Sequence, residues 1–253
     1  MGEHVAPASP MKKRRSNIFW NIVGVVGELL ITFAFVIGLF SVWQLYWTTY
    51  EVSGQVEQTI ASFEEDHQPT KRTQGETRTD DPPEFTREVG AGEVYGLIHV
   101  PTWDWMKIPL AEGTTSDVLD QGWAGHYDMT TQPGGVGNFS VAGHRRTYGN
   151  NFRWIDRLTQ GDKVVVEVDD HYLVYSMVSS EIIDATDPTQ MRVVAPVIDD
   201  VSWSETPTER WMTMTTCHPE YGNWQRFIVH LKFESWTPKD TGVPAELVDE
   251  PQN

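Results

Sequence analysis

The chain has 253 residues, enough for one sizeable domain with appended segments. Its formal net charge of −17 leaves no basic stripe that could meet phosphates, which argues against nucleic acid as a partner. Cys217 is the single cysteine, so no intrachain disulfide can form, and its thiol is either a small buried hydrophobe or a reactive group.

The N-terminal part combines a basic cluster at 12–15 with the most apolar stretch of the chain, 18–47. Within it, 29–46 is free of charge over about 18 residues, enough to cross a bilayer. Glu28 then lies at the inner boundary of a span that begins near Leu29, where a carboxylate costs least. The far end carries aromatic rings that favour the membrane interface: Trp43, Tyr46 and Trp47.

Basic clusters stay in the cytoplasm, so the sequence predicts a single-pass type II protein of the cell membrane. Residues 1–17 would be cytoplasmic, 18–47 transmembrane, and everything later extracellular. A signal peptide is the rival interpretation, but the apolar run is too long for one and no small-residue cleavage pattern follows it. A buried core helix is the other alternative, and the basic flank and aromatic rim disfavour it.

Residues 48–91 are predicted to be an extracellular linker. Its first part, 52–63, could continue as a short helix, whereas 64–88 is rich in Glu, Asp, Thr, Arg and Pro and predicts a disordered spacer. The polar tail 237–253 is expected to be flexible. We therefore expect 92–236 to be the folded domain and to fold alone.

Within 92–236 the patterns predict mainly β structure. The long connection 184–209 is of the kind that is usually functional or disordered. Many short strands with few helices are typical of an antiparallel barrel or sandwich. Strands are expected at 94–100, 104–110, 139–143, 163–168 and 172–183, with short helices at 114–119 and 151–158.

The stretch 213–233 predicts a hairpin. Alternation up to Cys217 indicates a strand, and Pro219, Gly222 and Asn223 supply turn residues. The returning strand has one apolar face, and Arg226 has the opposite parity, so it points away from the core. Folding the hairpin brings the Cys217 thiol and the Arg226 guanidinium into one neighbourhood. The apolar face consists of Phe227, Val229, Leu231 and Phe233.

A cysteine nucleophile needs a partner for its thiolate and a donor for a developing oxyanion. His144 ends the 139–143 strand with parity opposite to its apolar residues, so it also points away from the core. His218 adjoins Cys217, but neighbours on a strand point to opposite faces, so it is badly placed to bond the thiol. The other extracellular histidines carry no local signature of a base.

These segments resemble the motifs of the sortase family. Thr213 to Pro219 read Thr-Met-Thr-Thr-Cys-His-Pro, which resembles the Thr-Leu-x-Thr-Cys-x-Pro signature that precedes a family arginine. Gly137 to Arg145 resemble the Gly-Asn-x-x-x-x-Gly-His-Arg motif. The resemblance implies a sortase β-barrel over 92–236 and a cysteine transpeptidase. It also implies three catalytic residues, namely Cys217, His144 and Arg226.

Gly125-His126-Tyr127 resembles the class E branch of actinobacterial sortases, in which the tyrosine lines the substrate groove. Tyr127 and Thr216 are accordingly the candidate substrate-binding residues. Class E enzymes typically prefer a Leu-Ala-x-Thr-Gly sorting signal to Leu-Pro-x-Thr-Gly. The resemblance also implies that the 184–209 connection walls the groove.

The resulting expectation is a membrane-anchored transpeptidase that cleaves a sorting signal between Thr and Gly. Its partners would be secreted proteins with C-terminal sorting signals, together with a peptidoglycan-precursor amine or a pilin as acceptor. No metal or cofactor is expected, because no Asp/Glu cluster has calcium-loop spacing. Two alternatives stay open: another Cys/His peptidase or wall cross-linking enzyme, and a non-catalytic membrane-tethered binding module. Thiol reactivity separates the binding module from the enzymes.

Overall fold

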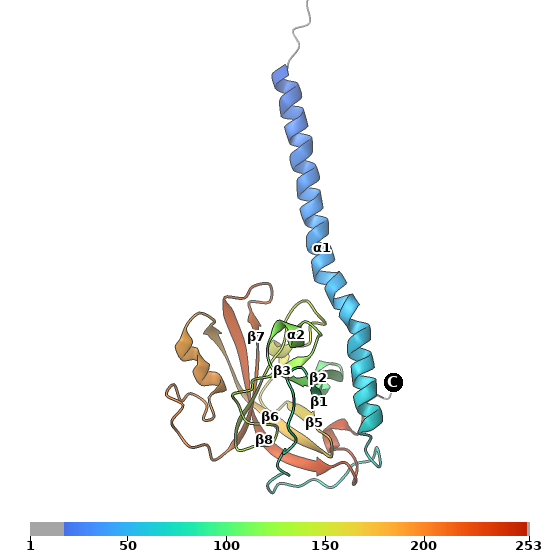
Figure 1. Cartoon of the computed structure of the whole chain (residues 1–253), viewed down its shortest axis with the longest axis vertical. Helices are drawn as coiled ribbons and strands as arrows, with labels where there is room; N and C mark the ends of the chain where they lie inside the picture. The colour runs from blue at the N-terminus through green and yellow to red at the C-terminus, as the bar shows by residue number, and fades with distance from the viewer. Residues whose placement is uncertain (1–17, 252–253) are drawn as a thin grey trace, which may run out of the picture. The chain divides into compact units, whose positions relative to one another are not determined.

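The computed structural model describes residues 18–251, which form one long helix followed by a closed eight-stranded barrel (Figure 1). Around the barrel the strand order is β1-β2-β3-β4-β7-β8-β6-β5. The prediction of a mainly β fold is confirmed. The strands are β1 (Val94–Val100), β2 (Met106–Glu112), β3 (Ala124–His126), β4 (Gly137–Ala142), β5 (Lys163–Glu167), β6 (His171–Asp184), β7 (Arg210–His218) and β8 (Gln225–Pro238).

The helical segments are few and short apart from α1 (Ile18–Asp66). They are α2 (Ser116–Leu119) and four 3₁₀ turns, η1 (Pro101–Trp103), η2 (Ile155–Arg157), η3 (Pro188–Val194) and η4 (Ala245–Leu247). Most neighbouring strands pair antiparallel, but β2 with β3 and β4 with β7 pair parallel. The parallel β4–β7 pair matters most for function, since it ends at the same side of the barrel as the β7–β8 turn.

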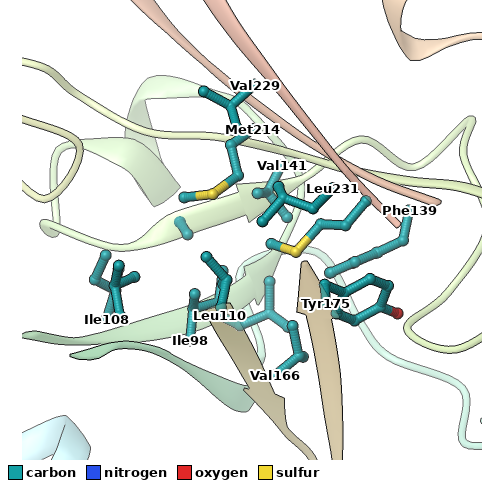
Figure 2. Close-up of a cluster of buried hydrophobic side chains, with 14 of the residues drawn as sticks. Ile98, Ile108, Leu110, Phe139, Val141, Val166, Tyr175, Met214, Val229 and Leu231 are labelled. Carbon is teal, nitrogen blue, oxygen red and sulfur yellow. The ribbon is translucent and has the colours of Figure 1, made fainter. Parts of the chain in front are cut away.

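The barrel interior is filled by alternate residues of the strands, as the period of two requires (Figure 2). Phe139 and Val141 of β4 and Met214 of β7 point inward and are fully buried. Met214 stands where the motif that the sequence resembles has leucine, and methionine is a volume-conserving replacement for leucine in a core. Because these residues point inward, the residues between them in sequence point to the outside of the barrel.

Helix α1 is uninterrupted from residue 18 to residue 66. Its part Phe19–Trp43 is the one helix in the described residues that is long and apolar enough to cross a membrane, with a hydropathy of 2.4. This candidate span begins earlier than Leu29 and includes Glu28. The basic cluster at 12–15 lies outside the described residues. The described part of the chain separates into two units, with the boundary between Trp43 and Gln44.

The expectation of a disordered spacer is wrong for the segment that follows α1. Gly75 donates its backbone N–H to the Val243 carbonyl at 2.8 Å, and Arg78 and Trp236 exchange two backbone hydrogen bonds of 2.9 Å. Further along, Phe85 and Val89 pack against the main core. Every non-proline residue has the same backbone donor and acceptor, so composition does not indicate which segments pair through the backbone. The polar composition of this segment therefore gave a wrong prediction.

The C-terminal tail, expected to be flexible, is packed through residue 250. Val243 and Leu247 are buried against Val165, Tyr172 and Val174 on the outside of the barrel. Glu250 is also buried and binds His99 Nδ1 at 2.8 Å. The folded unit therefore extends beyond 92–236 at both ends.

Three local differences have simple causes. The second strand begins at Met106 rather than 104, because Asp104 and Trp105 adopt positive φ angles of 58° and 59° in a turn. Strand β3 is only three residues long and gave no periodic signal. The 151–158 stretch forms turns and η2 instead of an α-helix, since apolar residues spaced three apart also align on a 3₁₀ turn.

Candidate active site

The parallel β4–β7 pair positions His144 beside Cys217. Its last registered pair is Ala142 with Thr215. The segment after β4 stays hydrogen-bonded to β7 for one more residue. Gly143 N–H donates to the Thr215 carbonyl at 3.1 Å, and the Thr216 hydroxyl donates to the Gly143 carbonyl at 2.7 Å. Continuing this register, His144 follows β4 at the level of Cys217 on β7.

The β7–β8 hairpin places Arg226 directly opposite Cys217. Cys217 is a free, half-buried thiol. The Arg226 guanidinium donates through Nη1 to the carbonyls of Asn223 at 2.7 Å and Gln225 at 2.9 Å. Among residues 18–251 no carboxylate forms an ion pair with it, so its remaining N–H groups are available to a substrate oxygen. The predicted hairpin is therefore confirmed, and the thiol and guanidinium share one end of it.

His144 has a partner that the sequence did not indicate. Its Nε2 lies 2.7 Å from Oδ1 of Asp120, which comes directly after α2. The Tyr148 ring stacks on the imidazole, with centroids 5.3 Å apart. Asp120 is 24 residues away in sequence, and no periodic or motif signal pairs it with His144.

Tyr127 follows β3 and lies close to the same site. Its phenol is bonded to the Thr215 hydroxyl at 2.9 Å. Burial raises the pKa of Tyr127, while the Thr215 hydrogen bond and the charge of Arg226 lower it, and Cys217 raises it. The hydrogen bond attaches Tyr127 to β7 two residues before Cys217, which places it at the Cys217 end of that strand.

Thr216 reaches the site in a different way. Its side chain is buried, and its hydroxyl donates a hydrogen bond to the Gly143 carbonyl. Thr216 thus ties the end of β7 to the residue before His144. Of the predicted site residues, the structure brings Cys217, Arg226, His144 and Tyr127 to one end of the barrel, with Thr216 as the link beneath them.

The other nearby histidines are held by different partners. His218 Nδ1 accepts from the Arg145 guanidinium at 2.9 Å, and its ring packs against Phe227. Burial and the positive charge of Arg145 lower the pKa of His218. His126 is fully buried and bonded to Glu112 at 2.9 Å, as a core histidine would be.

The 184–209 connection is ordered, and Asn138 of β4 holds it. The buried Asn138 amide donates to the carbonyls of Val193 and Ala195 at 3.0 and 3.1 Å, while its oxygen accepts from Thr213 at 2.8 Å. Tyr127 packs against the apolar cluster beneath this connection, which includes Val193 and Val194. The asparagine of the Gly-Asn motif thus anchors the loop beside the candidate site.

A closed barrel that sets a free thiol opposite an arginine and beside a histidine is the architecture of a cysteine enzyme. The family model of the sortase domain matches residues 98–234, more than half of the chain. The chain therefore belongs to the sortase family, whose members are cysteine transpeptidases.

Similar proteins support the same assignment and the class E resemblance. Sortase SrtE1 of Streptomyces coelicolor is 36% identical over 229 residues, covering 88% of this chain; the chain spans 60% of that relative's length. The solved SrtA sortase from Actinomyces oris is 43% identical, with a TM-score of 0.64, over 70% of this chain and 99% of that one. The structure of Sortase E1 from S. coelicolor with a tripeptide in the active site is 37% identical, with a TM-score of 0.55, over 63% and 99%.

Proposed function

We propose that this chain cleaves a sorting signal between its Thr and Gly residues and transfers the acyl group to an amine on a cell-wall precursor or a pilin. Cys217 is the nucleophile, His144 the general acid and base, and Arg226 the donor to the oxyanion. The observation that carries the proposal is the Cys217–Arg226 pair across the hairpin, with His144 brought alongside by the β4–β7 register.

The reaction proceeds in two half-reactions. The Cys217 sulfur attacks the Thr carbonyl, the C–N bond to Gly breaks, and His144 gives a proton to the departing amine. An incoming amine then attacks the thioester, gives a proton to His144, and releases the Cys217 thiolate. Arg226 stabilises the oxyanion in both steps through charge-assisted hydrogen bonds.

Peptide selection is assigned to the surface around Tyr127. The solved Sortase E1 from S. coelicolor holds a tripeptide in its active site, which supports a peptide substrate here. Tyr127 contacts the second position of the signal in this proposal, and the class E resemblance favours Leu-Ala-x-Thr-Gly over Leu-Pro-x-Thr-Gly. The loop held by Asn138 forms a wall of the groove.

The membrane anchor is part of the same proposal. Phe19–Trp43 spans the bilayer, residues 1–17 stay in the cytoplasm, and the barrel acts outside on secreted proteins. A tethered enzyme meets both a translocated substrate and a membrane-borne acceptor at the outer surface.

The test incubates the full chain, purified in detergent micelles, with a Leu-Ala-x-Thr-Gly peptide and separately with a Leu-Pro-x-Thr-Gly peptide. Mass spectrometry should show an adduct on Cys217 that carries the peptide up to its threonine, and a small amine should convert it to a Thr–amine product. Cys217→Ala should form no adduct, and Tyr127→Ala should lose the preference between peptides. If neither peptide labels Cys217 in folded protein, the proposed function fails and the binding-module alternative gains support.

A further inference from the structure

The Asp120 carboxylate is the hydrogen-bond partner of His144. The two side chains meet through Oδ1 and Nε2 at 2.7 Å. Asp120 is itself held in place, because its backbone N–H donates to the carbonyls of Ser116 and Val118 at the end of α2, and Val118 is buried. Asp120 is thus presented to His144 by a short anchored helix.

The rest of the imidazole is constrained by ring packing. Tyr148 stacks on its face with an interplanar angle of 30°. In the described part of the chain, the Asp120 bond is the one hydrogen bond that the ring makes, so Nδ1 is left free. One nitrogen is therefore committed to a carboxylate, and the other is available for chemistry.

We propose that Asp120 is a positioning residue that keeps a hydrogen on Nε2 of His144 and so makes Nδ1 the nitrogen that exchanges protons with substrate. The inference rests on the proposed function, because it assigns the atom through which His144 acts there. An ionised carboxylate only accepts hydrogen bonds. Nε2 must then carry its hydrogen in both the neutral and the protonated ring, and the proton that comes and goes is on Nδ1.

The proton movements balance with this assignment. In the first half-reaction the S–C bond to Cys217 forms, the Thr–Gly C–N bond breaks, and the Nδ1 proton passes to the leaving nitrogen. In the second, the attacking amine returns a proton to Nδ1 as the S–C bond breaks. Nε2 and Asp120 keep their hydrogen bond throughout, which fixes the ring while its charge changes.

The effect of Asp120 on folding stability should be small. The His144 and Asp120 side chains are 26% and 36% exposed, and ion pairs this open to solvent contribute little to stability. A large loss of turnover on changing Asp120 would consequently report on the orientation of the imidazole rather than on the fold.

The experiment compares Asp120→Asn and Asp120→Ala with wild type in the full chain in detergent micelles. Asp117→Asn is the matched control, since Asp117 lies in the helix that Asp120 follows, and among residues 18–251 its carboxyl has one hydrogen bond, from the Ser116 hydroxyl at 3.5 Å. An asparagine can accept from Nε2–H or donate to bare Nε2, so it permits both tautomers. Two readouts are used: kcat and KM for transpeptidation, and the nitrogen-15 shifts of the His144 ring.

We expect kcat to fall by about 10- to 1,000-fold in both Asp120 variants, with KM within about twofold, because a misoriented His144 loses part of the roughly 100- to 10,000-fold that general acid–base catalysis contributes. The wild-type ring should show hydrogen on Nε2, and Asp120→Asn a mixture. Wild-type or faster turnover in both variants, or hydrogen on Nδ1 of the neutral wild-type ring, would overturn the inference. If wild type itself does not turn over peptide, the proposed function fails, and the ring spectrum still decides the tautomer.

Discussion

Cys217 and Arg226 face each other across the β7–β8 pair, one position before the strands reach the turn. Directly opposed residues of an antiparallel pair have Cβ atoms about 4.5–5.5 Å apart and project from the same face. The guanidinium also donates hydrogen bonds to the carbonyls of Asn223 and Gln225 at the turn. Arg226 is consequently preorganised beside the thiol, and its planar shape should matter as much as its charge.

Arg226→Lys keeps the positive charge but loses the planar guanidinium. The side chain can then no longer hydrogen-bond the Asn223 and Gln225 carbonyls and a substrate oxygen at the same time. We expect kcat/KM to fall by about 100- to 1,000-fold, the scale of losing one oxyanion donor, with unchanged thermal unfolding. Arg157→Lys is the control, because Arg157 is exposed and contacts the Trp154 ring. Near-wild-type turnover of Arg226→Lys would reduce Arg226 to a surface charge.

His144→Ala should abolish transpeptidation, whereas His218→Ala should retain a substantial part of it. His218 is bound to Arg145 and has no direct part in the proposed proton transfers. Peptide transfer assays on the two variants, with circular dichroism to verify folding, decide the point. Complete loss of activity in folded His218→Ala would show that the strand-parity argument is wrong.

The sequence allowed the local part of this site to be predicted and missed the long-range part. Cys217 and Arg226 belong to one hairpin, so alternation alone brings them together. His144 could be given a direction by parity, but its place beside Cys217 depends on the parallel β4–β7 pair, which the expectation of an antiparallel barrel did not include. Only the motif resemblance assigned His144 and Cys217 to one site. Asp120 reaches His144 from a four-residue helix that has no periodic signal of its own. The packed segments around Gly75 and Val243 were missed because backbone pairing has no compositional signature.

Protease added to intact protoplasts should digest the barrel and spare residues 1–15. The reason is that basic clusters beside a span remain in the cytoplasm, and the barrel follows the candidate span Phe19–Trp43. Immunodetection with tags at each end of the chain follows the two parts separately. Protection of the barrel before lysis would contradict the proposed orientation.

Stability should decline between about pH 6.5 and pH 9 because of His99. Burial lowers the pKa of His99, but hydrogen bonds and charges from Glu167 and Glu250 outweigh it and raise the pKa to about 9. The protonated ring therefore stabilises the fold fully below the unfolded value of about 6.5, and this contribution is lost as the pH rises through 9. Lys107 and Lys239 belong to the same cluster, through ion pairs with Glu250 and Glu167 respectively.

Thermal unfolding of wild type and His99→Gln from pH 6 to pH 10 checks this. The variant should be less stable at pH 6, since it removes the imidazolium that is hydrogen-bonded to both buried carboxylates, Glu167 and Glu250. Its melting temperature should also change less with pH. Equal alkaline slopes of melting temperature against pH in both proteins would show that the loss of stability arises from groups other than His99.

At acid pH the relevant group is Glu167. Burial raises the pKa of Glu167, but His99 and Lys239 lower it to about 2, so its contribution to stability is lost only as the pH falls from about 4.5 towards 2.

The last prediction concerns the minimal folded unit. The fragment 92–236, which the sequence suggested would fold alone, lacks the buried side chains of Phe63, Val243 and Leu247 and the packed Phe85. Burial of each such side chain is worth about 1.5–3 kcal/mol, so the loss is comparable with the roughly 5–15 kcal/mol that stabilises a whole domain. We expect 44–251 to unfold cooperatively in urea and 92–236 to show a strongly lowered midpoint or no native baseline. Equal midpoints and equal slopes for the two fragments would show that residues 44–91 and the tail 237–251 cover the barrel without stabilising it.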